Sequence, residues 1–122
     1  MWQGMDRRRF PRAHYRCKII VIHKRHKEKL STFTENIGLG GVCVVLSKEL
    51  DKFSEAEMLI YLEDGQMPLG CVGRIVWVVK RESPGPEKKI EYDTGIEFVE
   101  LKDAERVRVE RIVQECLKKG LT

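Results

Sequence analysis

The 122 residues of the chain suffice for one domain around a single hydrophobic core. Hydrophobic residues make up 42% of the sequence, which excludes a wholly disordered chain, and no apolar run approaches the roughly 20 residues that a membrane-spanning helix needs. The formal net charge is only +4, too small for a general polyanion-binding surface, yet basic residues crowd the first 29 positions. Since these positions contain no apolar signal segment, we expect a cytoplasmic protein with one local site for an anion.

Arginine is concentrated in the stretch DRRRFPRAHYRC (6–17), which contains Arg7, Arg8, Arg9, Arg12 and Arg16. A guanidinium group is always charged, and its planar fork of donors matches phosphate oxygens or the O6/N7 edge of guanine. Arg8 and Arg12 are four positions apart on a segment that Pro11 keeps out of a continuous helix, so both can approach one ligand. A solvated basic tail is the simpler alternative. We interpret residues 1–12 as a flexible basic arm, because they carry little apolar surface and their charges repel one another.

Alternating apolar and polar residues predict six strands along the rest of the chain, at residues 15–25, 30–35, 42–47, 58–63, 71–82 and 90–100. Turn-forming stretches separate them, including DG at 64–65 and SPGP at 83–86. Within the fifth strand, strict alternation would place Ile75, Trp77 and Val79 on one face. Six strands joined by turns predict an all-β fold, a six-stranded antiparallel barrel.

The periodicity changes to that of a helix near the C-terminus. Apolar residues recur at three- and four-residue spacing, at Val109, Ile112, Val113, Cys116 and Leu117. This pattern predicts an amphipathic α-helix at about 103–119, with Asp103 as its N-cap and Lys118 and Lys119 at the negative end of its dipole. We expect residues 13–122 to form one domain, a barrel with this helix appended.

A glycine-rich stretch, NIGLGG (36–41), follows the second predicted strand. Gly38, Gly40 and Gly41 would let the backbone come close to a ligand, and Asn36 offers both a donor and an acceptor with which to read a purine edge. Taken alone, the stretch is more simply a turn between strands. It lacks the lysine of a phosphate-binding P-loop and does not match a dinucleotide-binding fingerprint.

Other chemistry is not indicated. The four cysteines, Cys17, Cys43, Cys71 and Cys116, form no C-x-x-C pair, so we expect them to be reduced and structural rather than zinc ligands. His23 and His26 are separated by two cations that would repel a metal. No nucleophile–base pair or carboxylate dyad stands out, so we expect neither an enzyme nor a bound cofactor or metal.

Arg8 to Arg12 (R-x-x-x-R), Asn36 to Gly41 (N-x-G-x-x-G) and the strands GRIVWV and YDTGIEFVEL together closely resemble the PilZ domain family, over roughly residues 6–118. The resemblance implies a six-stranded antiparallel barrel, often with a C-terminal helix, that binds the bacterial second messenger cyclic di-GMP. It implies that Arg8 and Arg12 meet guanine and phosphate, that Asn36 reads a guanine edge, and that Gly41 is the final glycine of the motif. Arg7 stands directly before the R-x-x-x-R motif, and in the family an arginine at that position implies a domain that holds a stacked pair of ligands.

One position departs from the family pattern, because Gly38 stands where the family has a serine. Losing one hydrogen bond to the ligand should weaken binding by about 1.5 to 3 kcal/mol, or one to two decades of affinity. We therefore expect a non-enzymatic cyclic di-GMP receptor whose ligand orders the arm and so signals to a protein partner. The expected ligand-binding residues are Arg7, Arg8, Arg12, Asn36, Gly38 and Gly41.

Two alternatives stay open. The first is a PilZ-like barrel that binds no ligand and works through protein contacts alone, which the absent serine would favour. The second is a nucleic-acid-binding barrel that uses the basic N-terminal region, with Tyr15 for base stacking. We rank the second last, because acidic residues are abundant in the rest of the chain.

Overall fold

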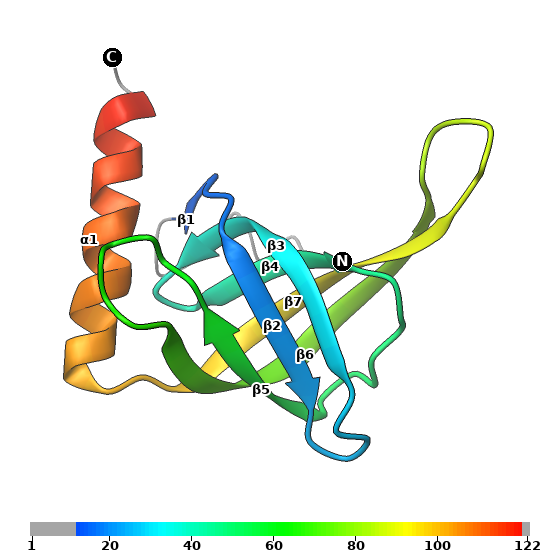
Figure 1. Ribbon diagram of the computed structural model, residues 1–122, viewed down its shortest axis with the longest axis horizontal. Coiled ribbons are helices and arrows are strands. Elements are labelled where there is room, and N and C mark those ends of the chain that lie inside the picture. The colour runs from blue at the N-terminus through cyan, green and yellow to red at the C-terminus, as the bar shows by residue number, and fades with distance from the viewer. Residues whose placement is uncertain (1–11, 121–122) are drawn as a thin grey trace.

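The computed structural model describes residues 12–120 (Figure 1). Most of the predicted arm, with Arg7 and Arg8, lies outside the described residues. Within them, the elements are β1 (Arg12–Ala13), β2 (Lys18–His23), β3 (Lys29–Gly38), β4 (Gly41–Leu46), β5 (Glu55–Ile60), β6 (Leu69–Glu82), β7 (Ile90–Glu100) and α1 (Asp103–Gly120). Arg12, which was predicted to belong to the arm, is therefore part of a strand.

Six of these strands close a barrel by antiparallel pairing. The order is β3–β2–β5–β6–β7–β4, and pairing between β3 and β4 closes the ring. β1 adds two further pairs to the end of β3, and the strand predicted at 15–25 is observed as the shorter β2. The predicted all-β fold, a six-stranded antiparallel barrel with a C-terminal helix, is confirmed.

The hydrophobic core fills the inside of this barrel. Inward positions alternate with outward ones along each strand, as in β5, where Ala56, Met58 and Ile60 are buried and the residues between them are exposed or half-buried. The largest fully buried side chains come from most of the strands and from the loop after β5: Ile19, Ile37, Leu46, Met58, Ile60, Leu62, Leu69, Ile75 and Ile96. Because strands from all around the ring contribute, the described residues form one contiguous core.

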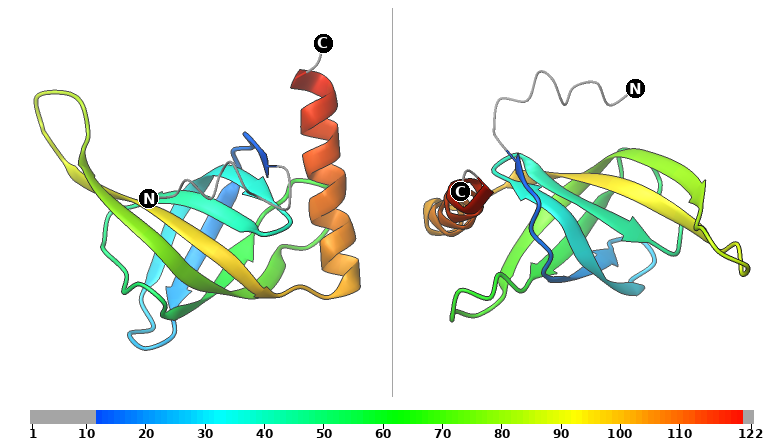
Figure 2. Two further views of the ribbon diagram at one scale, coloured as in Figure 1. Left: turned by 180° about the vertical axis from the view of Figure 1, so that it is seen from behind. Right: turned by 90° about the horizontal axis from the view of Figure 1, so that it is seen from above.

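Helix α1 stands at one end of the barrel, beside β1 and β3 (Figures 1 and 2). Most of its predicted apolar stripe packs against the core there, with Val109, Ile112 and Val113 buried and Cys116 partly buried, whereas Leu117 is exposed. On the side of the barrel away from the helix, the β6–β7 hairpin extends outward as a twisted ribbon (Figure 2). The region around β1 is therefore enclosed by the helix on one side and by β3 on the other. No helix within residues 12–120 is both long and apolar enough to cross a membrane.

The helix starts one residue earlier than the predicted N-cap at Asp103 would allow. Arg106 donates its backbone N–H to the carbonyl of Lys102 at 2.9 Å, and Lys102 donates its own N–H to the Glu105 carboxylate at 2.9 Å. Lys102 is thus the N-cap, with Glu105 closing half of a capping box, and Asp103 is the first helical residue. The prediction of Asp103 as N-cap was wrong, because the Glu105 carboxylate accepts the backbone N–H of Lys102 and so makes Lys102 the N-cap.

A partly buried ion pair ties the helix to the β5–β6 loop. Arg108 binds the Asp64 carboxylate through two hydrogen bonds, Nε to Oδ2 at 2.8 Å and Nη2 to Oδ1 at 2.9 Å, and donates a third to the Met67 carbonyl at 2.8 Å. The Arg108 and Asp64 side chains are only 15% and 17% exposed. Hydrogen bonding from Arg108 lowers the pKa of the Asp64 carboxyl, so the carboxylate is stabilised in its charged form.

The alternation of side chains fails in β6. Its register against β7 shifts between Ile75, which pairs with Ile96, and Trp77, which pairs with Gly95. Ile75 is fully buried inside the barrel, whereas the Trp77 indole lies against Gly95. The expectation that Ile75 and Trp77 share a face was therefore wrong, because a bulge at Val76 turns the second residue outward.

Candidate functional site

The two sequence motifs meet where β1 pairs with β3. Arg12 is paired with Gly38, and the next residue, Ala13, is buried opposite Ile37. From this position the Arg12 side chain donates a hydrogen bond from Nη1 to Oδ1 of Asn36 at 3.3 Å. Gly41 in turn pairs with Gly38, so the structure brings together four of the six predicted site residues, namely Arg12, Asn36, Gly38 and Gly41.

The NIGLGG stretch is a tight hairpin rather than an open glycine loop. Residues 36–38 belong to β3, only Leu39 and Gly40 form the turn, and Gly41 begins β4 opposite Gly38. Gly38 is buried and has a paired strand on each side, with Arg12 on one and Gly41 on the other. The hairpin therefore fixes the distance between the arginine and the glycines through backbone pairing.

Gly41 has a structural reason to be glycine. A Cβ atom at this position would overlap the carbonyl oxygen of Ile96 and lie 2.9 Å from the Cα of Glu97. Only a residue without a side chain lets β4 approach β7 this closely. The position of Gly41 next to the site is thus explained by strand packing, whether or not a ligand touches it.

A half-buried tryptophan, which the sequence analysis did not include in the site, lies on the same outer face. The strand registers form one lateral row of paired residues, Asn36 with Cys43, Cys43 with Gly95, and Gly95 with Trp77. Gly95 lies between the buried Thr94 and Ile96 and so faces outward, and the indole of Trp77 occupies the space that a Cβ at Gly95 would need. Since neighbouring strands are about 4.8 Å apart, the ring lies roughly 10 Å from Asn36. The sequence carries no signal for this arrangement, because the pairing of Trp77 with Gly95 depends on the register shift between β6 and β7.

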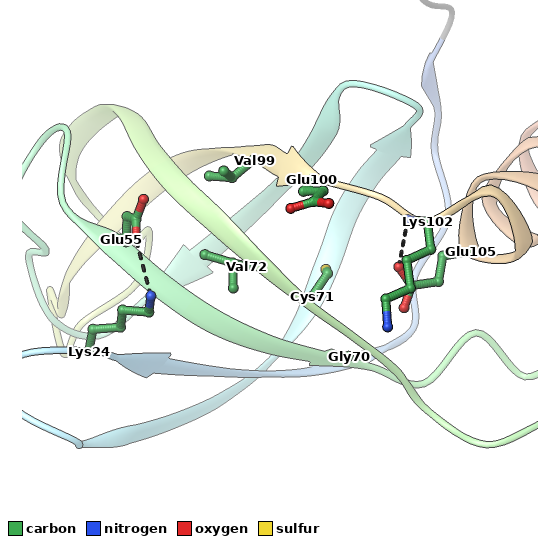
Figure 3. Close-up of a pocket in the computed structure, with 9 residues that line it drawn as sticks. All are labelled: Lys24, Glu55, Gly70, Cys71, Val72, Val99, Glu100, Lys102 and Glu105. Atoms are coloured by element: carbon green, nitrogen blue, oxygen red, sulfur yellow. Dashed lines mark hydrogen bonds and ion pairs between the residues drawn. The ribbon is translucent and has the colours of Figure 1, made fainter.

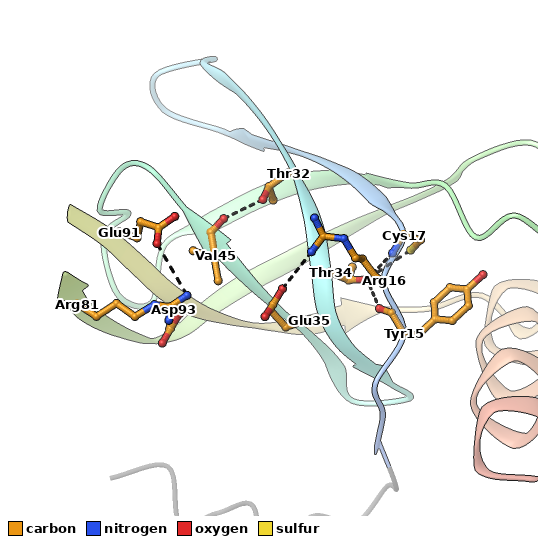
Figure 4. Close-up of polar contacts among 10 residues, drawn as sticks. All are labelled: Tyr15, Arg16, Cys17, Thr32, Thr34, Glu35, Val45, Arg81, Glu91 and Asp93. Atoms are coloured by element: carbon orange, nitrogen blue, oxygen red, sulfur yellow. Dashed lines mark hydrogen bonds and ion pairs between the residues drawn. The ribbon is translucent and has the colours of Figure 1, made fainter. Parts of the chain in front are cut away.

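The segment between β1 and β2 is held by neutral, hydrogen-bonded groups (Figure 4). Thr34 connects the backbone of Tyr15 and Cys17, and the Tyr15 hydroxyl donates to the carbonyl of Leu62. Burial raises the pKa of Tyr15 to about 12 and also raises that of the Cys17 thiol. Both groups therefore stay uncharged at neutral pH and add no negative charge beside Arg12.

Other cations near this face are already matched by acids. Arg16 lies 3.8 Å from the Glu35 carboxylate and 4.4 Å over the Phe33 ring, and Arg81 lies 3.1 Å from Asp93 (Figure 4). Such exposed pairs contribute little to stability, but they reduce the local positive potential. Among the described residues, this face therefore lacks the continuous basic stripe that a nucleic-acid-binding barrel would need.

A separate cavity of about 410 Å³ lies between the outer surface of the barrel and the start of the helix (Figure 3). The Lys24–Glu55 ion pair stands at one end, and Lys102 and Glu105 stand at the other. Burial raises the pKa of the Cys71 thiol in its wall to about 12, which leaves that thiol protonated and a poor nucleophile. Residues 12–120 contain no cluster of three or more metal-ligating side chains. Neither Arg12 nor Asn36 lines this cavity.

Comparison with known proteins gave one family match, to the PilZ domain, over residues 6–115. A search of curated proteins found no match. Among solved structures, the chain is similar to the PilZ domain with c-di-GMP of YcgR from Escherichia coli. The TM-score is 0.72 at 13% identity, with 93% of this chain and 94% of that chain covered.

Two further solved structures are matched over only about half of their own length. The inhibitor of motility MotI/DgrA from Bacillus subtilis matches with a TM-score of 0.67 at 17% identity, over 93% of this chain and 51% of that one. The MrkH–c-di-GMP complex from K. pneumonia matches with a TM-score of 0.71 at 14% identity, over 93% and 52%. At these identities the structural likeness establishes the barrel fold.

Proposed function

The chain belongs to the PilZ domain family, and from that premise we propose that it is a cytoplasmic, non-enzymatic receptor for cyclic di-GMP. The solved PilZ domain of YcgR and the MrkH complex contain this ligand. The observation that carries the proposal to this chain is the hydrogen bond between Arg12 and Asn36, because it joins the ends of both motifs at one corner of the barrel.

Each group at this corner has a distinct task in the proposed complex. Arg12 offers its guanidinium to a phosphate or to the O6/N7 edge of guanine, and Asn36 hydrogen-bonds a guanine edge. Trp77 provides an aromatic surface beside them on which a base can stack. Arg7 and Arg8, which precede Arg12 by five and four positions, supply further positive charge to the two phosphates of the ligand.

The proposed output is an ordering of the arm. Phosphate contacts remove the mutual repulsion of the arginines, so that the part of the arm that precedes β1 folds over the corner formed by Arg12 and Asn36. A protein partner that recognises the ordered arm and the adjacent barrel surface would read the concentration of the messenger. The domain itself performs no chemistry in this scheme.

Isothermal titration calorimetry with cyclic di-GMP tests the proposal when two matched arginine variants are compared. Arg12→Ala and Arg16→Ala each remove one positive charge from the same segment. Only Arg12 contacts Asn36, whereas Arg16 lies against Glu35 and Phe33. We expect Arg12→Ala to weaken binding about 10- to 100-fold and Arg16→Ala to change it less than about threefold.

Two outcomes would contradict the proposal in different ways. Equal losses in both variants would mean that binding depends on overall charge and not on the Arg12–Asn36 corner. A titration of the folded wild-type protein that releases no heat at any temperature would mean that the domain does not bind this ligand. Thermal unfolding of each variant beforehand provides the control for folding.

One observation favours a second candidate function, a PilZ domain that acts through protein contacts alone. Gly38 replaces the serine of the family, and it is buried between paired strands, so no hydroxyl is available there. Under this candidate the wild-type titration is flat, and a gain of binding in Gly38→Ser would identify the missing hydroxyl as the cause. Saturable binding by the wild type would instead favour the receptor.

A further inference from the structure

β1 and β2 are two parts of one strand, interrupted just after the site. Both lie on the same side of β3, with Ala13 paired with Ile37 and Lys18 paired with Phe33. Between these pairs, residues 14–17 of one strand face only residues 34–36 of the other, so one residue is in excess. On its other side β3 also changes register, between Thr34 and Asn36. Regular ladder pairing therefore fails on both sides of β3 at residues 34–36, next to the two residue pairs that hold β1.

The side chain of Thr34 replaces the missing ladder bonds (Figure 4). Its hydroxyl donates to the carbonyl of Tyr15 and accepts the backbone N–H of Cys17 at 3.0 Å, while the Thr34 N–H donates to the Cys17 carbonyl at 2.9 Å. The Cys17 sulfur lies 3.5 Å from the same hydroxyl. One threonine thus bonds to two residues, Tyr15 and Cys17, of the segment between β1 and β2.

This arrangement is enclosed by the core. Thr34 is fully buried and Cys17 is 1% exposed, and Ala13, at the end of β1, is 3% exposed. A backbone N–H or carbonyl that loses its partner in such a place is not readily solvated by water. Without the hydroxyl, the segment from Tyr15 to Cys17 must therefore move to find new partners, and β1 must move with it.

We propose that Thr34 is a positioning residue for ligand binding, because its hydroxyl fixes the break between β1 and β2 and so places Arg12 beside Asn36. This inference rests on the proposed function, because its main tests measure the affinity for cyclic di-GMP. Thr34 itself does not touch the ligand, since it faces the interior of the barrel and acts only through the backbone of residues 15–17.

Substitutions at Thr34 separate the hydroxyl from the shape of the side chain. Thr34→Val keeps the shape and removes both hydroxyl hydrogen bonds, and we expect it to weaken cyclic di-GMP binding about tenfold. Thr34→Ser restores the hydroxyl and is expected to bind within about twofold of the wild type. Thr34→Cys, which keeps a weak hydrogen-bonding group, is the second variant should Thr34→Val fail to fold, with an expected loss of about threefold.

Thr94→Val is the matched control. Thr94 is equally buried, and both threonines pair with the same residue, Val44, on opposite sides of β4. The Thr94 hydroxyl donates to the carbonyl of Tyr92 at 3.1 Å, within its own strand, and so bridges no break in the sheet. We expect Thr94→Val to leave affinity unchanged within about twofold. An equal loss in Thr94→Val and Thr34→Val would overturn the proposal, because it would reflect general destabilisation.

A double-mutant cycle with Arg12 measures the coupling of the two residues in ligand binding, which a merely structural role of Thr34 would leave at zero. Arg12→Ala is combined with Thr34→Val, and the fold-loss caused by Arg12→Ala is compared in the two backgrounds. If Thr34 positions Arg12, this fold-loss falls at least threefold in the Thr34→Val background. An identical fold-loss in both backgrounds would contradict the proposal.

Amide hydrogen exchange without ligand distinguishes failure of this inference from failure of the proposed function. In Thr34→Val we expect the Cys17 amide to exchange at least tenfold faster than in the wild type, with no such change in Thr94→Val. If the wild type binds no cyclic di-GMP but this exchange difference appears, only the proposed function fails. If Cys17 exchanges at the same rate in all three proteins, the positioning role of Thr34 fails.

Discussion

Arg12 and Asn36 are 24 positions apart in the sequence, yet the Arg12 guanidinium donates a 3.3 Å hydrogen bond to the Asn36 side chain. The contact follows from the pairing of β1 with the end of β3, which places Arg12 beside Gly38 and two residues from Asn36. The basic segment is thus anchored to the barrel at its last motif arginine.

The first prediction concerns Gly38. Because this position lacks the family's serine hydroxyl, Gly38→Ser should strengthen cyclic di-GMP binding by about 10- to 100-fold, which calorimetry can measure. Gly70→Ser is the control, since Gly70 is exposed on β6 and a Cβ there meets only ordinary contacts. Unchanged or weaker binding in Gly38→Ser would show that the missing hydroxyl does not limit affinity.

The second prediction concerns Trp77. If a guanine stacks beside Asn36, the ligand should quench the Trp77 fluorescence, measured in a Trp2→Phe background so that only one indole emits. Trp77→Leu should weaken binding about tenfold, because stacking of a base on an aromatic ring contributes about 1–3 kcal/mol. Saturable binding by calorimetry without any change in emission would exclude Trp77 from the site.

A third prediction tests the close approach of β4 and β7. Gly41→Ala should lower the free energy of unfolding by about 3 kcal/mol, because its Cβ would overlap the Ile96 backbone, which cannot move aside cheaply. Gly70→Ala, with its nearest contact 3.6 Å away at a Leu59 methyl, should change stability by less than about 1 kcal/mol. Urea unfolding measures both. Equal effects in the two variants would contradict the packing role assigned to Gly41.

The fourth prediction uses the ion pair between Asp64 and Arg108. Asp64→Asn should lower the free energy of unfolding by about 2 kcal/mol at pH 7, because the partly buried Arg108 loses a charged partner. The Asp64 pKa is lowered in the folded state from an ordinary value of 3.8. The stabilisation is therefore complete above that value and is lost as the pH falls through the lowered pKa.

Unfolding measured in urea at pH 7 and at successively lower pH checks this role of the carboxylate. The stability difference between wild type and Asp64→Asn should shrink only below about pH 4 and vanish once Asp64 is protonated in the folded protein. A difference that persists unchanged into this acid range would mean that the carboxylate charge is not what holds the helix to the β5–β6 loop.

Most of the barrel could be predicted from the sequence because alternation in a strand is a local property. The core positions of β5 and β7 follow from it, and the apolar stripe of α1 follows from an equally local helical period. The interruption at 14–17 and the bulge at Val76 could not be predicted, since each depends on the residues of a neighbouring strand. Those two irregularities are also what place Arg12 and Trp77 at the candidate site.

The residues of the two motifs could likewise be predicted only in part. Asn36 and Gly41 indicate a site from the sequence only in combination with the R-x-x-x-R motif, and their roles differ in the folded protein. Asn36 contacts Arg12, whereas Gly41 is required by the approach of β7. The buried Thr34 could not be assigned from the sequence, because a threonine in a predicted strand gives no sign of bonding to a segment 17 residues away.

Titration of ¹⁵N-labelled protein with cyclic di-GMP, followed by NMR, tests directly whether the ligand binds at the Arg12–Asn36 corner. We predict saturable shifts of the Arg12 amide, the Asn36 side-chain amide and the Trp77 indole N–H. The amides of Arg25 and His26, in the β2–β3 turn, should stay fixed and serve as internal controls. Shifts confined to that turn, or none at all at saturating ligand, would contradict the assignment of the ligand to this corner.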